Sequence, residues 1–116
     1  MFNIKDDRKN VIVDFLKDEL SEDVVCCLRN HLKLVSSNKQ IAINLKNVTS
    51  AKNEFFSLLK EFSNEKKICL YNLTADINLL LFLMNYNQYT HLYVNEADFK
   101  EGKRDLVRRD FKVCNF

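Results

Sequence analysis

Proline is absent from the 116-residue sequence, and glycine occurs once, at Gly102. A chain with one glycine cannot build the glycine-rich phosphate loops of P-loop or Rossmann proteins, and no stretch is typical of a flexible interdomain linker. The longest apolar run, Leu79 to Met84, is far too short to span a bilayer, and the first residues do not resemble a signal peptide. We therefore expect a single cytoplasmic domain over residues 1–116, with no direct membrane insertion.

An excess of charge is also missing, because 18 Lys and Arg face 16 Asp and Glu, for a net charge of +2. A nearly neutral chain has little long-range attraction to nucleic acid. The basic stretch 100–112 is interrupted by acidic residues and lacks the aromatic interleaving of a stacking surface, which favours a solvated, internally paired face. We expect no nucleic-acid partner.

The four cysteines and two histidines form no metal-binding or catalytic pattern. There is no C-x-x-C pair, and His31 and His91 have no Cys or carboxylate at a ligand or triad spacing. Cys69 lies in an apolar run and is typical of a small buried hydrophobe. The sequence thus predicts no metal, no cofactor and no enzymatic activity.

What the sequence does contain is a regular alternation of strand-like and helix-like segments. Phe2–Ile4 and Val11–Leu16 flank a polar turn and predict a hairpin. Ser21 stands at a helix N-cap, and apolar residues follow it at helical spacing as far as Val35. Further strands are predicted over 40–45, 67–71 and 91–94, with helices over 54–62 and from Thr74 to about residue 85.

A C-terminal helix and strand extension is predicted over residues 96–116. Asn95 is placed to cap a turn of helix, Gly102 to end it, and Phe111–Val113 to form an edge strand. The whole order is β-β-α-β-α-β-α-β plus this extension. Strands separated by helices favour an α/β fold with a mixed sheet, parallel right-handed crossovers and helices mainly on one face.

This organisation resembles the STAS domain, the family of anti-sigma-factor antagonists and of domains attached to sulfate transporters. Asp14–Ser21 is similar to the family's strand ending in Gly-Glu-Leu, and Ile41–Thr49 to its Val-Val-Leu-Asp-Leu-Ser-x-Val strand. Lys67–Thr74 and Leu79–Tyr93 are similar to the strand, capped third helix and last parallel strand that follow. The resemblance implies a domain that works by binding another protein.

The family's phosphoacceptor motif is absent. In the family the second helix starts with Asp-Ser-Ser-Gly or Asp-Ser-Thr-Gly, and a partner kinase phosphorylates a hydroxyl there. Here that tetrad falls on Lys52–Phe55 and holds no hydroxyl, while Thr49 and Ser50 lie a few residues earlier. Lys17 also replaces the family's glycine before the first helix. Ordinary serine phosphorylation at this position is therefore not expected.

Glu54 stands where the phosphoacceptor would be. Its charge either simply stabilises the helix start, which is the simpler interpretation, or holds the domain in a permanently phosphorylated-like state. The resemblance still implies a partner contact around this loop, and the residues expected to make it are Ser50, Lys52, Asn53 and Glu54.

The third helix carries apolar residues on two faces. Spacing residues by about 100° places Ile77, Leu80, Leu81 and Met84 toward the sheet. Leu79, Phe82 and Leu83 then lie on the opposite face, where either a partner or the segment after Asn95 should cover them. The sequence leaves both alternatives open.

We predict a non-catalytic, protein-binding regulatory module that resembles the anti-sigma-factor antagonists, with a regulator or kinase-like partner. Two alternatives stay open. One is the small cytoplasmic accessory subunit of a lipid-transporting ABC complex, bound to an ATPase subunit. The other is a domain that binds a small ligand or nucleotide at the strand ends. A homodimer is compatible with each.

Overall fold

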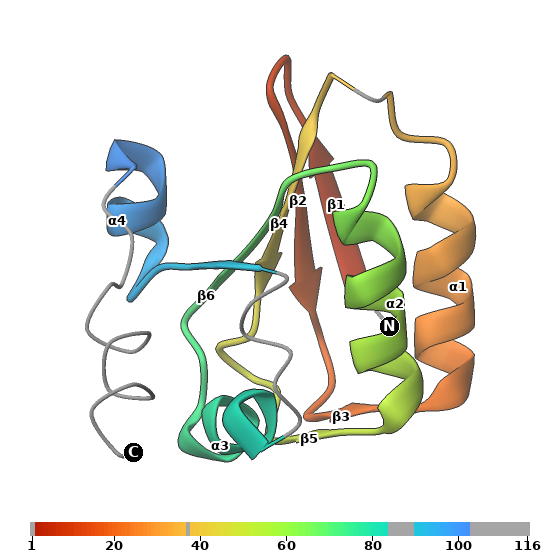
Figure 1. The fold of residues 1–116 in the computed structure, drawn as a ribbon, viewed down its shortest axis with the longest axis vertical. Coiled ribbons are helices and arrows are strands. Elements are labelled where there is room, and N and C mark those ends of the chain that lie inside the picture. Colours follow the sequence, from red (N-terminus) through yellow and green to blue (C-terminus); the bar gives the residue numbers. More distant parts are fainter. Residues whose placement is uncertain (1, 37, 84–89, 103–116) are drawn as a thin grey trace.

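The computed structural model describes residues 2–36, 38–83 and 90–102. Within these residues, a five-stranded sheet has the order β1-β2-β4-β6-β7 (Figure 1). β1 pairs antiparallel with β2, and the remaining neighbours are parallel. The strands are β1 (Phe2–Asp6), β2 (Asn10–Phe15), β4 (Gln40–Asn44), β6 (Ile68–Tyr71) and β7 (His91–Leu92). The predicted mixed α/β sheet is confirmed.

In the described residues, four helices accompany the sheet: α1 (Glu22–Leu32), α2 (Asn53–Ser63), α3 (Ala75–Leu83) and α4 (Glu96–Glu101). Ser21 is the N-cap of α1 as predicted, although its side chain makes no capping hydrogen bond. α1 ends at Leu32, short of the Val35 that the spacing predicted, and α2 begins one residue earlier than expected.

The hairpin between β1 and β2 is closed by an aspartate side chain. Asp7 Oδ1 accepts hydrogen bonds from the backbone N–H groups of Lys9 (2.9 Å) and Asn10 (2.7 Å). These two bonds lower the pKa of Asp7, because they stabilise its charged form. An Asx turn therefore closes this hairpin without the glycine that many hairpin turns contain.

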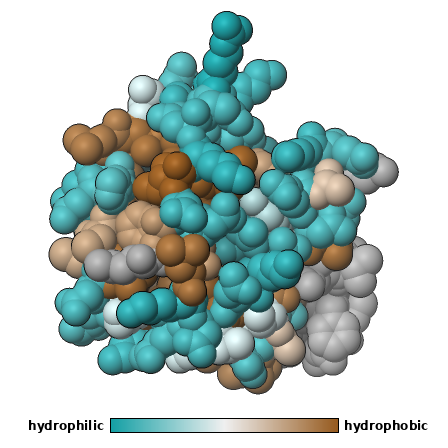
Figure 2. Space-filling model, turned by 180° about the vertical axis from the view of Figure 1, so that it is seen from behind, coloured by the Kyte–Doolittle hydropathy of each residue, from teal (hydrophilic) through white to brown (hydrophobic). Residues whose placement is uncertain are grey.

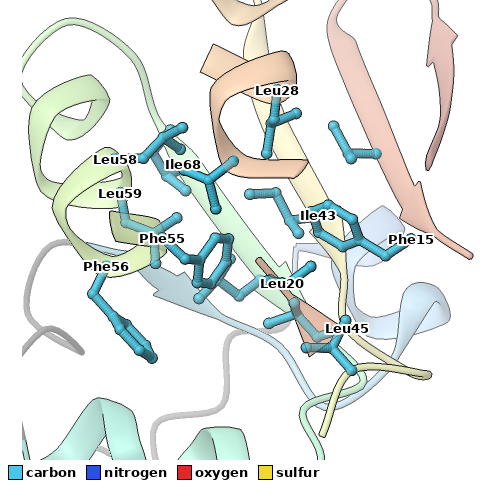
Figure 3. Packing of buried hydrophobic residues seen from close by; sticks show 14 of the residues in the cluster. Phe15, Leu20, Leu28, Ile43, Leu45, Phe55, Phe56, Leu58, Leu59 and Ile68 are labelled. Atoms are coloured by element: carbon cyan, nitrogen blue, oxygen red, sulfur yellow. The ribbon is translucent and has the colours of Figure 1, made fainter. Parts of the chain in front are cut away.

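The main core lies between the sheet and helices α1 and α2. Strand alternation turns Val13 and Phe15 toward this side, where the helices contribute Leu28 and Phe55. Figure 3 shows Phe15, Leu28 and Phe55 gathered between the layers, and the rings of Phe15 and Phe55 meet edge to face at 6.3 Å. The apolar periodicity of the two helices therefore reflects the face that each one buries.

The opposite face of the sheet has a smaller core under α4. Its buried members are Ile12, Ala42, Cys69, Tyr71, Tyr93 and Phe99. Phe99 of α4 stacks on Tyr71 at 5.4 Å and 8°, and meets Tyr93 edge to face at 5.4 Å. α1 and α2 therefore cover one face, whereas α4 lies on the other (Figure 1). Cys69 is buried, as predicted.

The predicted signals around α4 are confirmed. Asn95 Oδ1 accepts a hydrogen bond from Asp98 N (2.8 Å), and Gly102 ends the helix with φ 77°. A positive φ of this size suits glycine, which has no Cβ. The edge strand predicted at Phe111–Val113 lies outside the described residues.

Candidate protein-interaction surface

Two short strands that the sequence did not reveal organise the loops beyond the main sheet. β3 (Glu19–Leu20) and β5 (Ser50–Ala51) pair in parallel, with Glu19 opposite Ser50. The backbone N–H groups of Thr49 and Ser50 both donate to the Asp18 carbonyl, at 2.8 Å and 3.1 Å. Strands of two residues show no periodicity, so only their long-range pairing identifies them.

This pairing presents the predicted loop residues at the start of α2. Ser50, Lys52 and Asn53 are exposed, and Lys52 is the helix N-cap. From Lys52 to Phe56 the segment contains no hydroxyl group, and the nearest hydroxyls are those of Ser50 before it and Ser57 after it. The exposed surface of this helix start is polar and carries charges of both signs.

Glu54 lies in the first turn of α2 and is half-buried. A hydrogen bond from its own backbone N–H lowers the pKa of Glu54, because this bond stabilises the carboxylate. The side chain of Glu22, the first residue of α1, lies beside Glu54, so the starts of α1 and α2 lie next to each other. The charge of Glu54 is therefore held where the helix dipole favours an anion.

The predicted faces of α3 are confirmed for Ile77 and Leu81 and for Leu79 and Leu83, whereas Phe82, predicted on the outer face, is not exposed. Ile77 and Leu81 are fully buried, and Leu80 packs partly against the core. Leu79 and Leu83 are 57% and 72% exposed, while Phe82 is half-buried. The outer face of this helix therefore presents two large apolar side chains to solvent within the described part of the chain. Met84 lies outside that part.

A hydrogen bond joins α3 to the loop that leads into β5. Thr74 Oγ1 donates to the Val48 carbonyl at 2.6 Å and accepts a longer bond from Ile77 N at 3.4 Å. Thr74 is thus the predicted cap of α3 and also its link to the loop. As a result, α3 lies beside β5 at the same end of the molecule (Figure 1).

This arrangement matches known structures. The anti-sigma factor antagonist SpoIIAA, in its unphosphorylated form, aligns over 88% of this chain and 97% of its own, with 15% identity and a TM-score of 0.69. The chain has the STAS fold. The sequence itself matches no protein-family profile and no curated protein.

Two structures of TM1081 from Thermotoga maritima show the same STAS fold. Its NMR structure aligns over 87% of this chain and 86% of its own, with 17% identity and a TM-score of 0.70. Its crystal structure, assigned to the anti-sigma factor antagonists, aligns over 88% and 92%, with 15% identity and a TM-score of 0.67. The resemblance first seen in the strand and helix patterns is therefore confirmed for the fold.

Sequence reasoning missed a groove of mixed polarity on the other end of this STAS-like domain. Leu34, just beyond the end of α1, is 85% exposed and lines a cavity of about 220 Å³. The other lining residues are apolar (Ile4, Val11 and Val35) or polar (Asp6, His31, Ser36 and Lys39). Apolar surface gathers on the side that carries α1 and β1 (Figure 2). Ile4 and Val11 belong to β1 and β2, so the cavity forms only where the end of α1 meets this hairpin, and local spacing does not predict it.

Within residues 2–36, 38–83 and 90–102, no group of three or more His, Cys, Asp or Glu side chains is arranged to hold a metal ion. None of the helices in the same residues has the length and apolar character needed to cross a membrane.

Proposed function

We propose that this STAS-like domain is a non-catalytic cytoplasmic module that binds a regulatory or kinase-like protein. Its partner docks on one end of the molecule, called here the docking end, which comprises Ser50, Lys52, Asn53, Glu54, Leu79, Phe82 and Leu83. The observation that carries the proposal is the Thr74–Val48 hydrogen bond, which holds the apolar face of α3 beside the polar start of α2. Protein interfaces commonly combine such an apolar centre with a polar rim.

Three features support this choice. The exposed leucines of α3 are large apolar groups at one end of a fold whose core is already well filled. The loop beside them is held in place by the Asp18 carbonyl, so its exposed side chains are preorganised for contact. Solved structures with the same fold include anti-sigma factor antagonists.

Charge reversal at the polar rim tests the loop part of the docking end. Lys52→Glu is expected to weaken capture of the partner about threefold to tenfold, because rim charges act mainly on the association rate. The melting temperature should change little, because Lys52 is an exposed residue and surface substitutions have small effects on stability. Binding is measured by surface plasmon resonance against the protein that the chain pulls down from its source organism.

The matched control is Lys67→Glu, an exposed lysine just before β6 and outside the docking end. It makes the same change in net charge. Equal weakening by both variants would mean a general charge effect, and no weakening by Lys52→Glu would place the contact elsewhere. Mass spectrometry of the captured protein separates a regulator or kinase from an ATPase subunit.

We further propose that phosphorylation at the start of α2 does not switch this domain. The helix start has no hydroxyl, and the carboxylate of Glu54 already supplies a negative charge there. After incubation with a kinase from the source organism, peptide mass spectrometry should find no stoichiometric phosphate at Thr49 or Ser50. Glu54→Ser, which restores a hydroxyl at the position of the family's phosphoacceptor, is the positive control. Stoichiometric phosphate on Thr49 or Ser50 of the unaltered chain contradicts the proposal.

A further inference from the structure

A polar cavity opens on the face of the sheet that α4 only partly covers. Its volume is about 270 Å³. It is lined by Lys5, Asp14, Phe15, Leu16, Asn44, Lys46, Asn47 and Glu96, and is called here the strand-end cavity. Asp14 and Asn44 lie opposite each other at the carboxyl ends of the parallel strands β2 and β4. Ligands of open α/β sheets bind at such strand ends.

A chain of hydrogen bonds fixes the floor of this cavity. Asn44 Nδ2 donates to Asp14 Oδ1 at 2.9 Å. Asn44 Oδ1 accepts from Asn72 Nδ2 at 3.1 Å and from Lys46 N at 3.0 Å. The amide of Asn44 is therefore held in one orientation. The carboxylate of Asp14 can accept further hydrogen bonds, because no other described residue donates one to it. Such a preorganised carboxylate suits a cationic or hydrogen-bond-donating ligand group.

Charges of both signs surround this floor. Lys5 and Lys46 contribute two cations, and neither makes an ion pair with another described residue. Asp14 and Glu96 contribute two anions. Glu96 also forms an ion pair with Lys100, with 3.6 Å between Glu96 Oε1 and Lys100 Nζ. The four charges sum to zero. The cavity therefore complements a ligand that is neutral overall but carries separated charges.

Size and charge together argue against a nucleotide. The cavity volume of about 270 Å³ is below the range of roughly 300–1,000 Å³ found for sites of drug-sized ligands. The lining has no net positive charge to balance a polyphosphate, and no glycine-rich loop among the described residues donates backbone N–H groups to one. A small ligand with one ammonium and one carboxylate group satisfies both limits.

We propose that the strand-end cavity binds a small zwitterion of the chemical class of free amino acids, with its ammonium group at Asp14 and its carboxylate at Lys5 and Lys46. This site is separate from the residues of the docking end and does not depend on the protein-binding proposal. Because the site offers few contacts and is open to solvent, we expect a dissociation constant of about 1 mM.

The test uses the full chain, labelled with nitrogen-15, and the common free amino acids as probes at about 10 mM, roughly ten times the expected dissociation constant. At least one amino acid should shift the backbone amide signals of Phe15, Asn44 and Lys46 in a saturable way. Acetate and methylamine, which each carry only one of the two charges, should bind at least tenfold more weakly. The proposal is wrong if no amino acid shifts these signals in a saturable way. It is also wrong if acetate binds as tightly as the amino acid does.

Two variants locate the site. Asp14→Asn and Lys46→Ala should each weaken binding about tenfold, and Lys67→Ala, outside the cavity, should leave it unchanged. Lys46 is exposed and its side chain bonds to no described residue, so Lys46→Ala keeps the test valid if Asp14→Asn perturbs folding. Native binding by both folded variants overturns the proposal. Partner capture by these variants is a separate measurement, so failure of one proposal is distinguishable from failure of the other.

Discussion

Replacement of both Leu79 and Leu83 by Asp is expected to abolish partner capture while leaving the domain folded. The two side chains are 57% and 72% exposed, so a charge at either position stays in water in the free protein. In a complex, each buried leucine contributes about 1.5–3 kcal/mol. The loss of both corresponds to a drop in affinity of at least about a hundredfold. Plasmon resonance and thermal unfolding measure the two effects separately.

Leu34→Asp, which adds one of the two charges at another exposed leucine, is the control, because Leu34 is 85% exposed and follows the C-terminal end of α1, far from the docking end. It should leave capture unchanged. Phe82→Ser is less decisive, since Phe82 is half-buried and its loss affects folding as well as contact. If the double variant loses a few kcal/mol of folding stability, a segment of the same chain covers this face. Native stability and native capture together would place the interface elsewhere.

Tyr71→Phe is expected to remove a large part of the alkaline destabilisation of this domain. Tyr71 is fully buried, and its hydroxyl has no hydrogen-bond partner among the described residues. Burial raises the pKa of Tyr71 well above its usual value, and the negative charges of Glu96 and Asp14 raise it further. The neutral phenol is therefore the form that the folded state accepts.

The sign of the pH dependence follows from this shift. Below about pH 10 the phenol is neutral in both the folded and unfolded chains, so its contribution is complete. Above about pH 10 the unfolded chain releases this proton and the folded chain does not, so stability falls by about 1.4 kcal/mol per pH unit from this group alone. Urea unfolding at a series of pH values should show a shallower decline for Tyr71→Phe than for the unaltered chain.

Phenolate absorbance provides an independent check of the same group. One tyrosine should titrate only as the protein unfolds, and this step should disappear in Tyr71→Phe. At neutral pH the variant should be as stable as the unaltered chain or slightly more so, since the hydroxyl that it lacks makes no hydrogen bond within the described residues. Parallel pH profiles for both proteins would contradict this account of Tyr71.

The strands and helices could be predicted because their signals are local. Phe55, Leu58, Leu59 and Phe62 recur with the period of a helix, and the structure buries all four on one side of α2. The same reasoning placed Leu79 and Leu83 on the outer face of α3, where they are exposed. The caps of α4 at Asn95 and Gly102 could also be predicted from the sequence, since each depends on the conformational preference of a single residue.

Other features depend on residues that are distant in the sequence. β3 and β5 exist because Glu19 pairs with Ser50, and neither dipeptide has a pattern of its own. The resemblance implied that the start of α2 is a contact site, but only the Thr74–Val48 bond places α3 next to it. The cavity beside Leu34 likewise forms only where the end of α1 meets β1 and β2.

By itself, therefore, the sequence determined the order of the elements, the face that each helix buries and the absence of a hydroxyl at the start of α2, because these depend on residue type and short-range spacing. Only the tertiary structure decided which surfaces those elements form together. Asp14 and Asn44 meet through the register of β2 and β4, and Glu96 reaches their cavity because Phe99 stacks on Tyr71 and holds α4 on that face of the sheet. Such contacts arise from packing between distant segments, which no local pattern encodes.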